Sequence, residues 1–363
     1  MSPSATFAPF LVASRIRRLL GVALALMVIG TSALLATIPA EADSAAEARS
    51  ASFTISGSGW GHGWGMSQYG AYGAARKGLS WKQILAFYYR GTQLSVMPAG
   101  TRIKVWITAD SDSSLRVLPA NGLTVSDTAG RHYTVPTGPA YKSWRITRRG
   151  TGYRLSYRTT SGSYVTKSTG LSTGTWSFST RSRIVRVVLP NGSVRSYRGS
   201  VALIKRRSGG RTINRVLLED YVKGVVPAEM PTSWAAGAVR AQAVAARSYA
   251  VRLRDFGGYT GYDICDTTAC QVYGGMSRET TDGNAAVRAT AGKIVTYRGK
   301  VALTQFASSN GGLQRQGGLS LSRRPSRPLR RSDQVSGMDS GDQRTQDWWS
   351  LAVGRDSEAV ADH

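Results

Sequence analysis

Hydrophobic and polar residues alternate in short runs through residues 101–204. Clear examples are 101–107, 152–157 and 184–189, and the connections contain Asn-Gly and Ser-Gly pairs, which favour turns. Alternation with a period of two is typical of strands that bury one face. The pattern therefore predicts an antiparallel, β-rich segment that forms either a barrel or a sandwich.

Two stretches of the chain, 194–204 (VRSYRGSVALI) and 294–304 (IVTYRGKVALT), have closely similar sequences. Each carries two short apolar runs separated by an Arg-Gly pair, and glycine readily adopts the backbone conformations that tight turns need. Each stretch is therefore predicted to form a β-hairpin that turns at Arg-Gly.

The pattern becomes helical between residues 213 and 258. The alanine-rich part, 234–256, begins after a Pro-Thr-Ser sequence and is followed by a Gly-Gly pair, which predicts a helix over these residues. Within this helix, arginines recur at every seventh position and so lie near one face: Arg240, Arg247 and Arg254.

An earlier helix is predicted to begin at residue 80. The sequence from Ser80 to Gln83 has the Ser-x-x-Gln form of a capping box, in which each side chain bonds the other residue's backbone N–H. Gly91 is placed to end this helix.

The chain is strongly basic, with 47 Lys and Arg against 21 Asp and Glu and a formal net charge of +26. Nucleic acid, an anionic cell wall and a membrane surface all match such a charge.

The N-terminus decides between these partners. Arginines within 15–18 precede an apolar run at 19–35, and Ala40-Glu41-Ala42 has the A-x-A form of a signal-peptide cleavage site. We therefore expect a secreted protein of the cell wall or extracytoplasmic space that binds no nucleic acid. Anionic wall polymers or the membrane surface then match its charge, and an uncleaved N-terminal membrane anchor is the alternative to cleavage.

Changes in composition divide the chain into five parts. Beyond residue 312 the sequence is rich in Arg, Ser and Pro and has no apolar pattern able to build a core, so we expect a disordered or frame-shifted tail. The expected parts are a signal peptide (1–42), a glycine-rich segment with a capped helix (43–100), the β-rich segment (101–204), a core segment (205–312) and the tail (313–363).

Residues 57–73 (GSGWGHGWGMSQYGAYG) place seven glycines around His62. Glycine lets a backbone or a ligand approach closely, at an entropic cost in folding. His62 has three open interpretations: a zinc ligand, a contact for sugar hydroxyls, or a packed side chain bonded to a loop carbonyl. A zinc site needs further ligands, whereas Trp60 and Trp64 offer flat faces for sugar rings.

Four segments with unusual composition stand out: LLEDYVKGVVPAEMPTSWAAGAVRAQAVAARSYA at 217–250, QVYGG at 271–275, VTYRGKVALTQFASSNGG at 295–312 and GHGWGMSQYGA at 61–71. Together they resemble segments of the SpoIID/LytB family, which is named for stage II sporulation protein D and an amidase-enhancer protein. One departure is the order of the segments, since the glycine-rich segment follows the glutamate segment in the sporulation protein and precedes it here.

The resemblance implies an exported bacterial cell-wall protein with one of two activities. Members like the sporulation protein are lytic transglycosylases that cleave peptidoglycan glycan strands. Members like the enhancer activate a separate N-acetylmuramoyl-L-alanine amidase.

Glu229 is the expected acid–base residue. It lies in the apolar sequence VVPAEMP, which should raise its pKa and keep the carboxyl protonated, so that it can donate to a glycosidic oxygen. A second carboxylate is not needed when the sugar's own 6-hydroxyl attacks, because that attack is intramolecular. Glu219 and Asp220 are expected to face the dipole at a helix start.

Arg247 matches a family arginine implicated in activity, which implies that it holds the glycan or stabilises developing negative charge. A solvated arginine on the helix face is the alternative. The further residues expected to bind substrate are His62, Trp60, Trp64, Ser67, Gln68, Gln242 and Tyr249.

Cys265 and Cys270 are the two cysteines of the chain. Two close cysteines in an exported protein predict a disulfide, and free thiols are an alternative. Some family members hold zinc in this region with a neighbouring histidine, but no histidine is adjacent here. We therefore expect no metal and no cofactor, with zinc as the disfavoured alternative.

Together these patterns predict an α+β fold with a β-rich barrel or sandwich and a helical, glutamate-bearing segment that forms a glycan groove. The predicted function is that of a secreted peptidoglycan lytic transglycosylase. A non-catalytic wall-binding protein that enhances an amidase is the alternative, because the tyrosine-bearing segment that follows Ser-Ser-Asn-Gly-Gly in the family is missing after Gly312. The expected partners are peptidoglycan glycan strands and, for the alternative, a cell-wall amidase.

Overall fold

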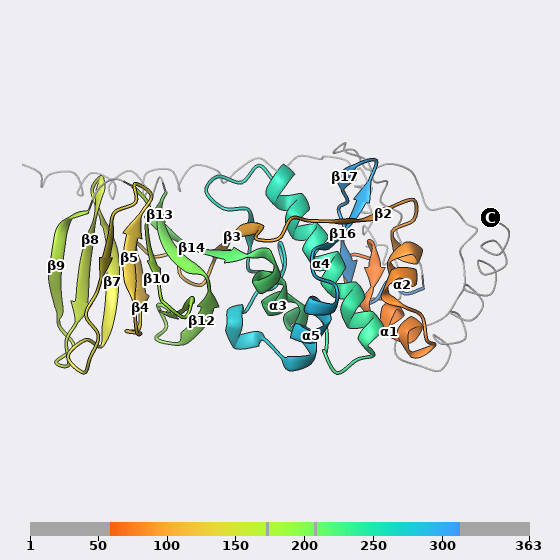
Figure 1. Cartoon of the computed structure of the whole chain (residues 1–363), viewed down its shortest axis with the longest axis horizontal. Coiled ribbons are helices and arrows are strands. Elements are labelled where there is room, and N and C mark those ends of the chain that lie inside the picture. Colours follow the sequence, from red (N-terminus) through yellow and green to blue (C-terminus); the bar gives the residue numbers. More distant parts are fainter. Residues whose placement is uncertain (1–58, 172–173, 207–208, 313–363) are drawn as a thin grey trace, which may run out of the picture. The chain divides into compact units, whose positions relative to one another are not determined.

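The computed structural model describes residues 59–171, 174–206 and 209–312 (Figure 1). The predicted signal peptide (1–42) and tail (313–363) lie outside these residues. No helix in the described part is long and apolar enough to cross a membrane.

The fold is α+β, as the sequence predicts. The helices are α1 (Gln68–Arg76), α2 (Trp81–Tyr88), α3 (Leu218–Glu229), α4 (Ala236–Phe256), α5 (Thr281–Ala289) and the short 3₁₀ helix η1 (Gly275–Arg278). The strands are β1 (Met66–Ser67), β2 (Gln93–Val96), β3 (Arg102–Ile107), β4 (Ser114–Val117), β5 (Thr124–Asp127), β6 (His132–Thr134), β7 (Ser143–Arg149), β8 (Gly152–Arg158), β9 (Tyr164–Leu171), β10 (Trp176–Ser179), β11 (Ile184–Val188), β12 (Val194–Arg198), β13 (Ser200–Lys205), β14 (Gly210–Leu217), β15 (Ile264–Cys265), β16 (Lys293–Tyr297), β17 (Lys300–Val301) and β18 (Phe306–Ala307).

Two large sheets make up the β-rich part. One has seven strands in the order β15-β3-β14-β13-β10-β5-β6, and the other has six in the order β12-β11-β4-β7-β8-β9. Neighbouring strands are antiparallel except for β15, which runs parallel to β3. Strands β4 and β11 of the six-stranded sheet lie against β13 of the other sheet, with side chains such as Val117, Val187 and Val201 fully buried. Among the described strands neither order closes on itself, so the segment is not a closed barrel.

The hairpin predicted at 194–204 is wrong. β12 pairs with β11 in the six-stranded sheet, whereas β13 pairs with β10 and β14 in the seven-stranded sheet. Gly199 forms the corner between the sheets at φ +83°, and a side chain there would clash with the carbonyl oxygen of Arg215. The similar stretch at 294–304 does form a hairpin, since β16 pairs with β17 across Arg298 and Gly299. Both outcomes fit the same local pattern, because an Arg-Gly corner can fold a strand back or pass it to another sheet.

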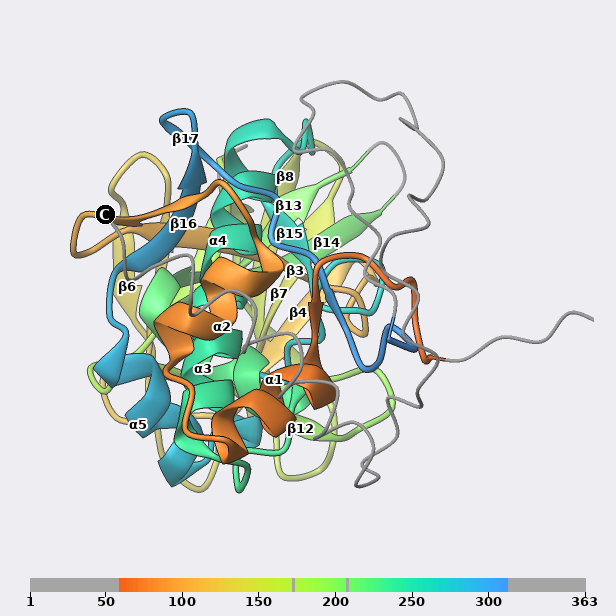
Figure 2. The same cartoon turned by 90° about the vertical axis from the view of Figure 1, so that its right-hand side faces the viewer.

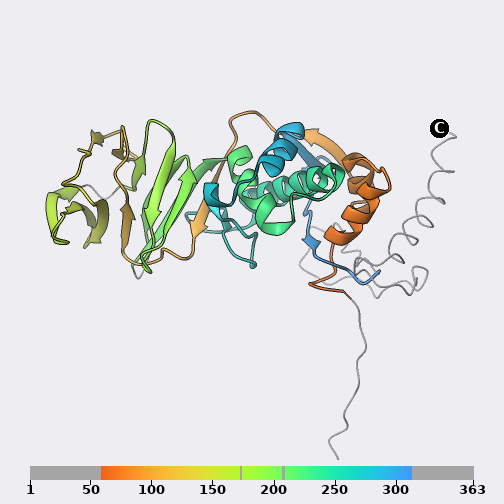
Figure 3. The ribbon, with the colours of Figure 1, turned by 90° about the horizontal axis from the view of Figure 1, so that it is seen from below.

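The helices α3, α4 and α5 pack together, and α1 and α2 lie against α4 (Figures 2 and 3). The alanines of α4 allow this close approach, because their small side chains are buried against neighbours. The predicted helix at 234–256 begins two residues later than expected, at Ala236. Residues 213–217, which were predicted to be helical, instead complete β14. This strand is central in its sheet and buried on both faces, so it lacks the alternation that marks a half-exposed strand.

The capping box of α2 is confirmed. The Ser80 hydroxyl accepts from the backbone N–H of Gln83, and the Gln83 side chain accepts from the backbone N–H of Ser80. The helix ends at Tyr88, before Gly91.

Candidate functional site

Glu229 is the last residue of α3, where both its backbone and its side chain are held by distant segments. Its carbonyl oxygen accepts a hydrogen bond of 2.9 Å from Gln68 Nε2. The last carbonyl groups of a helix lack partners within the helix, so the Gln68 amide caps this end of α3. The carboxylate Oε1 accepts a hydrogen bond of 2.7 Å from the backbone N–H of Val272.

Burial raises the pKa of Glu229 above its ordinary value, and the hydrogen bond from Val272 opposes this rise. Desolvation disfavours the charged form of a carboxyl group, so this group stays protonated to a higher pH than a free glutamate. The side chain is half-buried rather than enclosed. A protonated carboxyl that solvent reaches is suited to donating a proton to a bound ligand.

The segment that carries Val272 is fixed by its neighbour Gln271, whose side chain is buried. Gln271 Oε1 accepts a hydrogen bond of 3.0 Å from the Tyr221 hydroxyl, and Nε2 donates one of 3.3 Å to the Ala246 carbonyl. These two contacts tie the segment to α3 and α4. The direction of the Val272 N–H is therefore set by both helices that flank Glu229.

The glycine-rich segment reaches Glu229 by pairing with the residues before Gly312. β1 runs parallel to β18, and Trp60 and Ser309 exchange two backbone hydrogen bonds. At Gly65 (φ +71°) any side chain would clash with the carbonyl oxygen of Gln305. At least one of the glycines around His62 therefore serves close backbone packing, which places Gln68 beside α3.

His62 lies at the exposed end of this segment. Its Nδ1 accepts a hydrogen bond of 3.0 Å from the Trp64 N–H. Burial lowers the pKa of His62 below its ordinary value, and a hydrogen bond with the backbone of Phe306 partly opposes this. The Phe306 ring lies 6.5 Å from the Tyr249 ring, and burial raises the pKa of Tyr249, with smaller contributions from Tyr259 and Glu229. Phe306 thus links His62 to Tyr249, and Tyr249 is close enough to Glu229 for the two side chains to interact electrostatically.

The remaining predicted substrate-binding residues differ in exposure. Trp60 is 79% exposed and available to a ligand, and Trp64 is half-buried. Ser67 and Gln68 are buried, with Ser67 capping α1 through the N–H of Gly70. Gln242 is fully buried and lies 3.5 Å from Gln68. The burial of Ser67, Gln68 and Gln242 does not fit the expected direct contact with a glycan.

Arg247 is fully buried, and its guanidinium has partners for all five N–H groups. Nε and Nη2 form a bidentate pair with the Glu219 carboxylate at 2.8 and 2.7 Å. The other donors reach the carbonyl oxygens of Ala243, Lys293 and Val287. This placement differs both from the predicted contact with glycan and from the solvated alternative. The seven-residue spacing with Arg240 and Arg254 did not mark Arg247 as the buried member.

Residues 206–297 match the SpoIID family, described as "Stage II sporulation protein". This chain carries a SpoIID domain.

Three relatives match parts of the chain. The amidase enhancer of Bacillus subtilis (strain 168) is 46% identical over 91 residues, which are 25% of this chain and 12% of the enhancer. An uncharacterized protein of Brachyspira hyodysenteriae is 38% identical over 117 residues, 32% of each chain. Stage II sporulation protein D of B. subtilis is 36% identical over 124 residues, 29% of this chain and 35% of the relative. The matches thus span about a third or less of each relative.

The matched residues of the SpoIID domain contain Glu229, Arg247 and the segment that carries Val272, whereas Gln68 and His62 come from outside them. Two contacts of this site were not predicted from the sequence: the hydrogen bond from the Val272 N–H to Glu229 and the ion pair between Glu219 and Arg247. Every residue except proline has a backbone N–H, so the sequence does not show which of them will donate to a side chain. Glu219 was visible as an acidic residue but was assigned to the start of its own helix.

A disulfide joins Cys265 and Cys270, as the sequence predicts. It closes the turn that follows β15, and Cys270 lies two residues before Val272. No group of three or more His, Cys, Asp and Glu side chains gathers within the part of the chain that the structure describes.

Replacing both cysteines with serine is expected to lower the free energy of unfolding by about 2 kcal/mol, because the disulfide restricts the unfolded chain. The loosened segment should also weaken the Val272 hydrogen bond, which holds the pKa of Glu229 down, so this pKa should rise further. Denaturant unfolding and the pH profile of activity measure the two effects. Free thiols in the protein purified from the exported fraction would contradict the expectation.

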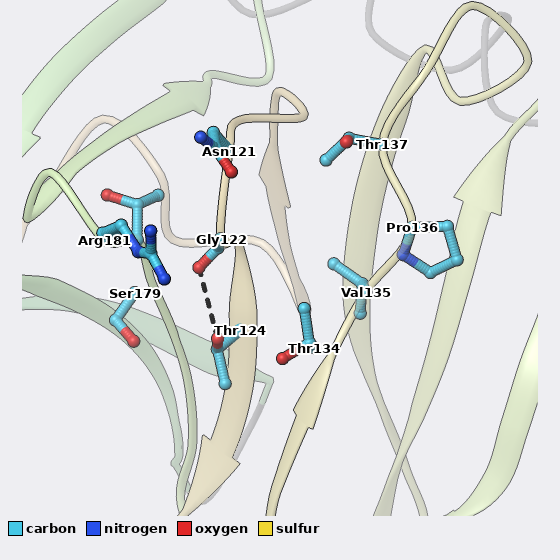
Figure 4. A pocket seen from close by; sticks show the side chains of 10 residues that line it. Asn121, Gly122, Thr124, Thr134, Val135, Pro136, Thr137, Ser179 and Arg181 are labelled. Atoms are coloured by element: carbon cyan, nitrogen blue, oxygen red, sulfur yellow. Dashed lines mark hydrogen bonds between the residues drawn. The ribbon is translucent and has the colours of Figure 1, made fainter.

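A separate cavity of about 650 Å³ lies in the β-rich part (Figure 4). Its wall is rich in hydroxyl groups, and Thr124 Oγ1 donates to the Gly122 carbonyl at 3.2 Å. The lining contains Arg181 but no carboxyl or imidazole group, so it offers no titratable group comparable to the Glu229 carboxyl.

Proposed function

We propose that this protein is an exported, cell-wall lytic transglycosylase that cleaves peptidoglycan glycan strands with Glu229 as its acid and base. The observation that carries the proposal is the Glu229 carboxyl, which is half-buried, raised in pKa and oriented by the Val272 N–H. The match of residues 206–297 to the SpoIID family supports it.

In the proposed reaction the protonated Glu229 donates its proton to the glycosidic oxygen, and the bond between that oxygen and the muramic acid C1 breaks. The 6-hydroxyl oxygen of the same sugar forms a new bond to C1, and its proton passes to the Glu229 carboxylate. One carboxyl group thus acts first as acid and then as base, and it returns to its starting state. No water is consumed, and the product ends in a 1,6-anhydro sugar.

Three of the other acidic side chains of the SpoIID domain are held in ion pairs, which makes them less available as a second acid–base group. Glu219 is bound by Arg247, and Asp220 by Lys223 at 2.8 Å. Glu279 forms a bidentate pair with Arg198. Any of these three carboxylates would have to leave its cationic partner to act as a nucleophile or to activate water.

The product distinguishes this reaction from hydrolysis. Digestion of purified peptidoglycan in ¹⁸O-labelled water should release 1,6-anhydromuramoyl ends that contain no label, because the attacking oxygen comes from the sugar. Mass spectrometry of the fragments measures this. Reducing ends that carry ¹⁸O would show hydrolysis and overturn the proposed reaction.

Enhancement of an amidase is a second candidate, favoured by the 46% identity to the amidase enhancer. In that case the protein would bind wall glycan and stimulate an N-acetylmuramoyl-L-alanine amidase without cleaving glycan itself. Stimulation of an added amidase that persists in Glu229→Gln, with no glycan cleavage by the unsubstituted chain, would select this function.

A further inference from the structure

Three arginines converge on one face of the six-stranded sheet. Arg116 on β4 lies directly opposite Arg145 on β7, and Arg154 on β8 lies opposite Thr147, two residues along β7 from Arg145. Directly opposed residues have Cβ atoms about 5 Å apart, and residues two apart on a strand point to the same face. The three side chains therefore form one cluster, here called the arginine face.

This face lies in the most basic part of the chain. Residues 101–204 contain sixteen Lys and Arg, three Asp and no Glu, and so carry half of the net charge of +26. One of the three aspartates, Asp112, lies 3.7 Å from Arg116, and its side chain is 42% exposed. A single exposed carboxylate does not neutralise three neighbouring guanidinium groups.

The arginine face has an electrostatic penalty. Like charges directly opposite each other destabilise a sheet. Burial lowers the pKa of Arg145; Tyr164 opposes this, and the charges of Arg116 and Arg154 add to it. Arg145 nevertheless stays in place, because its Nε donates to Ser156 Oγ at 3.3 Å and its guanidinium lies 3.5 Å from the centre of the Tyr164 ring. A sheet built only for stability would gain from neutral residues at these positions.

Three buried polar atoms of this face have no hydrogen-bond partner among the described residues: Arg116 Nε, Arg154 Nε and Thr147 Oγ1. Buried polar groups are nearly always paired, because leaving one unpaired is costly. Arg116 lies in the row that it forms with Arg145, and Thr147 and Arg154 lie opposite each other in the next row. The unpaired atoms are donors, as is required to bind an anion.

We propose that the arginine face is a binding site for a phosphodiester polymer, separate from the SpoIID domain and its Glu229. Guanidinium groups pair with phosphate oxygens through parallel N–H donors, and such charge-assisted hydrogen bonds are the strong ones. The Cβ atoms of these arginines are spaced by about 5 Å for the opposed pair and about 7–8 Å on the diagonal, so a polymer that binds all three needs closely spaced anions. A chain with one phosphate in each short repeat supplies that density, whereas carboxylates on separate peptide stems do not.

A membrane surface fits this face less well. Proteins that lie on a membrane present large apolar or aromatic side chains beside their basic residues. Among the described residues of this sheet, the exposed large hydrophobic side chains are Val165 on β9 and Val194 on β12, and none comes from β4, β7 or β8. The aromatic ring beside Arg145, that of Tyr164, is half-buried and in contact with the guanidinium group. The site is therefore assigned to a polymer rather than to lipid headgroups.

The binding test uses the full chain and oligo(glycerol phosphate) of defined length as probe, with isothermal titration at about 0.15 M salt. Replacement of Arg116, Arg145 and Arg154 with Gln should raise the dissociation constant roughly tenfold to hundredfold. The matched control replaces Arg102, Lys104 and Lys205, which are exposed strand residues of the other sheet, and removes the same charge. The control should change binding by less than about threefold.

A variant with Lys at all three arginine positions separates recognition from bulk charge. Lysine keeps the charge but cannot form the parallel donor pair, so binding should weaken nearly as much as with Gln. If the control and Gln variants lost binding equally and the Lys variant bound fully, binding would depend only on overall positive charge. That result would overturn the proposal.

Thermal unfolding gives an independent readout. Without probe, the Gln variant should be at least as stable as the unsubstituted chain, because like-charge repulsion is removed. The probe should raise the melting temperature of the unsubstituted chain and not that of the Gln variant. A Gln variant that unfolds at lower temperature than the unsubstituted chain would show that the arginines stabilise the fold. In a separate binding assay, stronger binding to phosphatidylglycerol vesicles than to oligo(glycerol phosphate) would assign the face to a membrane. Either result, or unchanged binding by the Gln variant, overturns the proposal without bearing on Glu229.

Discussion

Replacing Glu229 with Gln is expected to slow glycan cleavage by roughly a hundredfold to ten-thousandfold, while binding to glycan strands persists. Glutamine keeps the shape of the side chain and can still accept from the Val272 N–H, but it has no proton to donate. Release of soluble fragments from purified peptidoglycan measures the rate, and co-sedimentation measures binding. Asp282→Asn, at an exposed acidic position on α5, is the matched control and should retain full activity.

The same substitution should change how stability depends on pH. The pKa of Glu229 is raised on folding, so the folded state holds this proton more tightly than the unfolded state does. The stability that this provides is complete at low pH, below the unfolded pKa, and is lost as the pH rises through the folded pKa. Glu229→Gln should remove this loss, and an unfolding series that shows the same loss in both proteins would contradict the assigned burial.

Replacing Arg247 with Met is expected to lower the free energy of unfolding by about 3 kcal/mol, because removing one partner of a buried ion pair leaves the other charge uncompensated. The remaining Glu219 side chain is 35% exposed, and water partly compensates it, which places the effect at the low end of the range. Three backbone carbonyl oxygens also lose one of their donors. Arg240→Met, one heptad earlier at an exposed position on the same helix, should change stability by no more than about 0.5 kcal/mol.

Arg247→Met should lower glycan cleavage only to the extent that it destabilises the fold. The arginine joins α4 to the start of α3 and to the first residue of β16, so it acts on Glu229 by holding α3 in position. Glu219→Leu combined with Arg247→Met should recover part of the lost stability, since an apolar pair can replace a buried ion pair. A variant of Arg247 that lost activity while unfolding at the original temperature would instead indicate direct contact with the substrate.

The sequence by itself determined those elements whose signals are local. The Ser80–Gln83 capping box, the helix that ends before Gly257 and the hairpin at 294–304 each depend on residues a few positions apart. The disulfide is equally local, since its cysteines are five residues apart. Glu229 was also identified from its own neighbours, because an apolar surrounding sequence already implies a desolvated carboxyl.

Only the tertiary structure decided which partners meet across long separations. The stretch at 194–204 has nearly the sequence of a true hairpin, but its two strands join different sheets because β11 and β14 are there to pair with them. Arg247 became a buried ion-pair residue because Glu219, 28 positions earlier, is brought to it by helix packing. Strand pairing and charge burial are determined by free energies summed over the whole fold. A local sequence pattern contains only one partner of each long-range contact, so it does not predict the other.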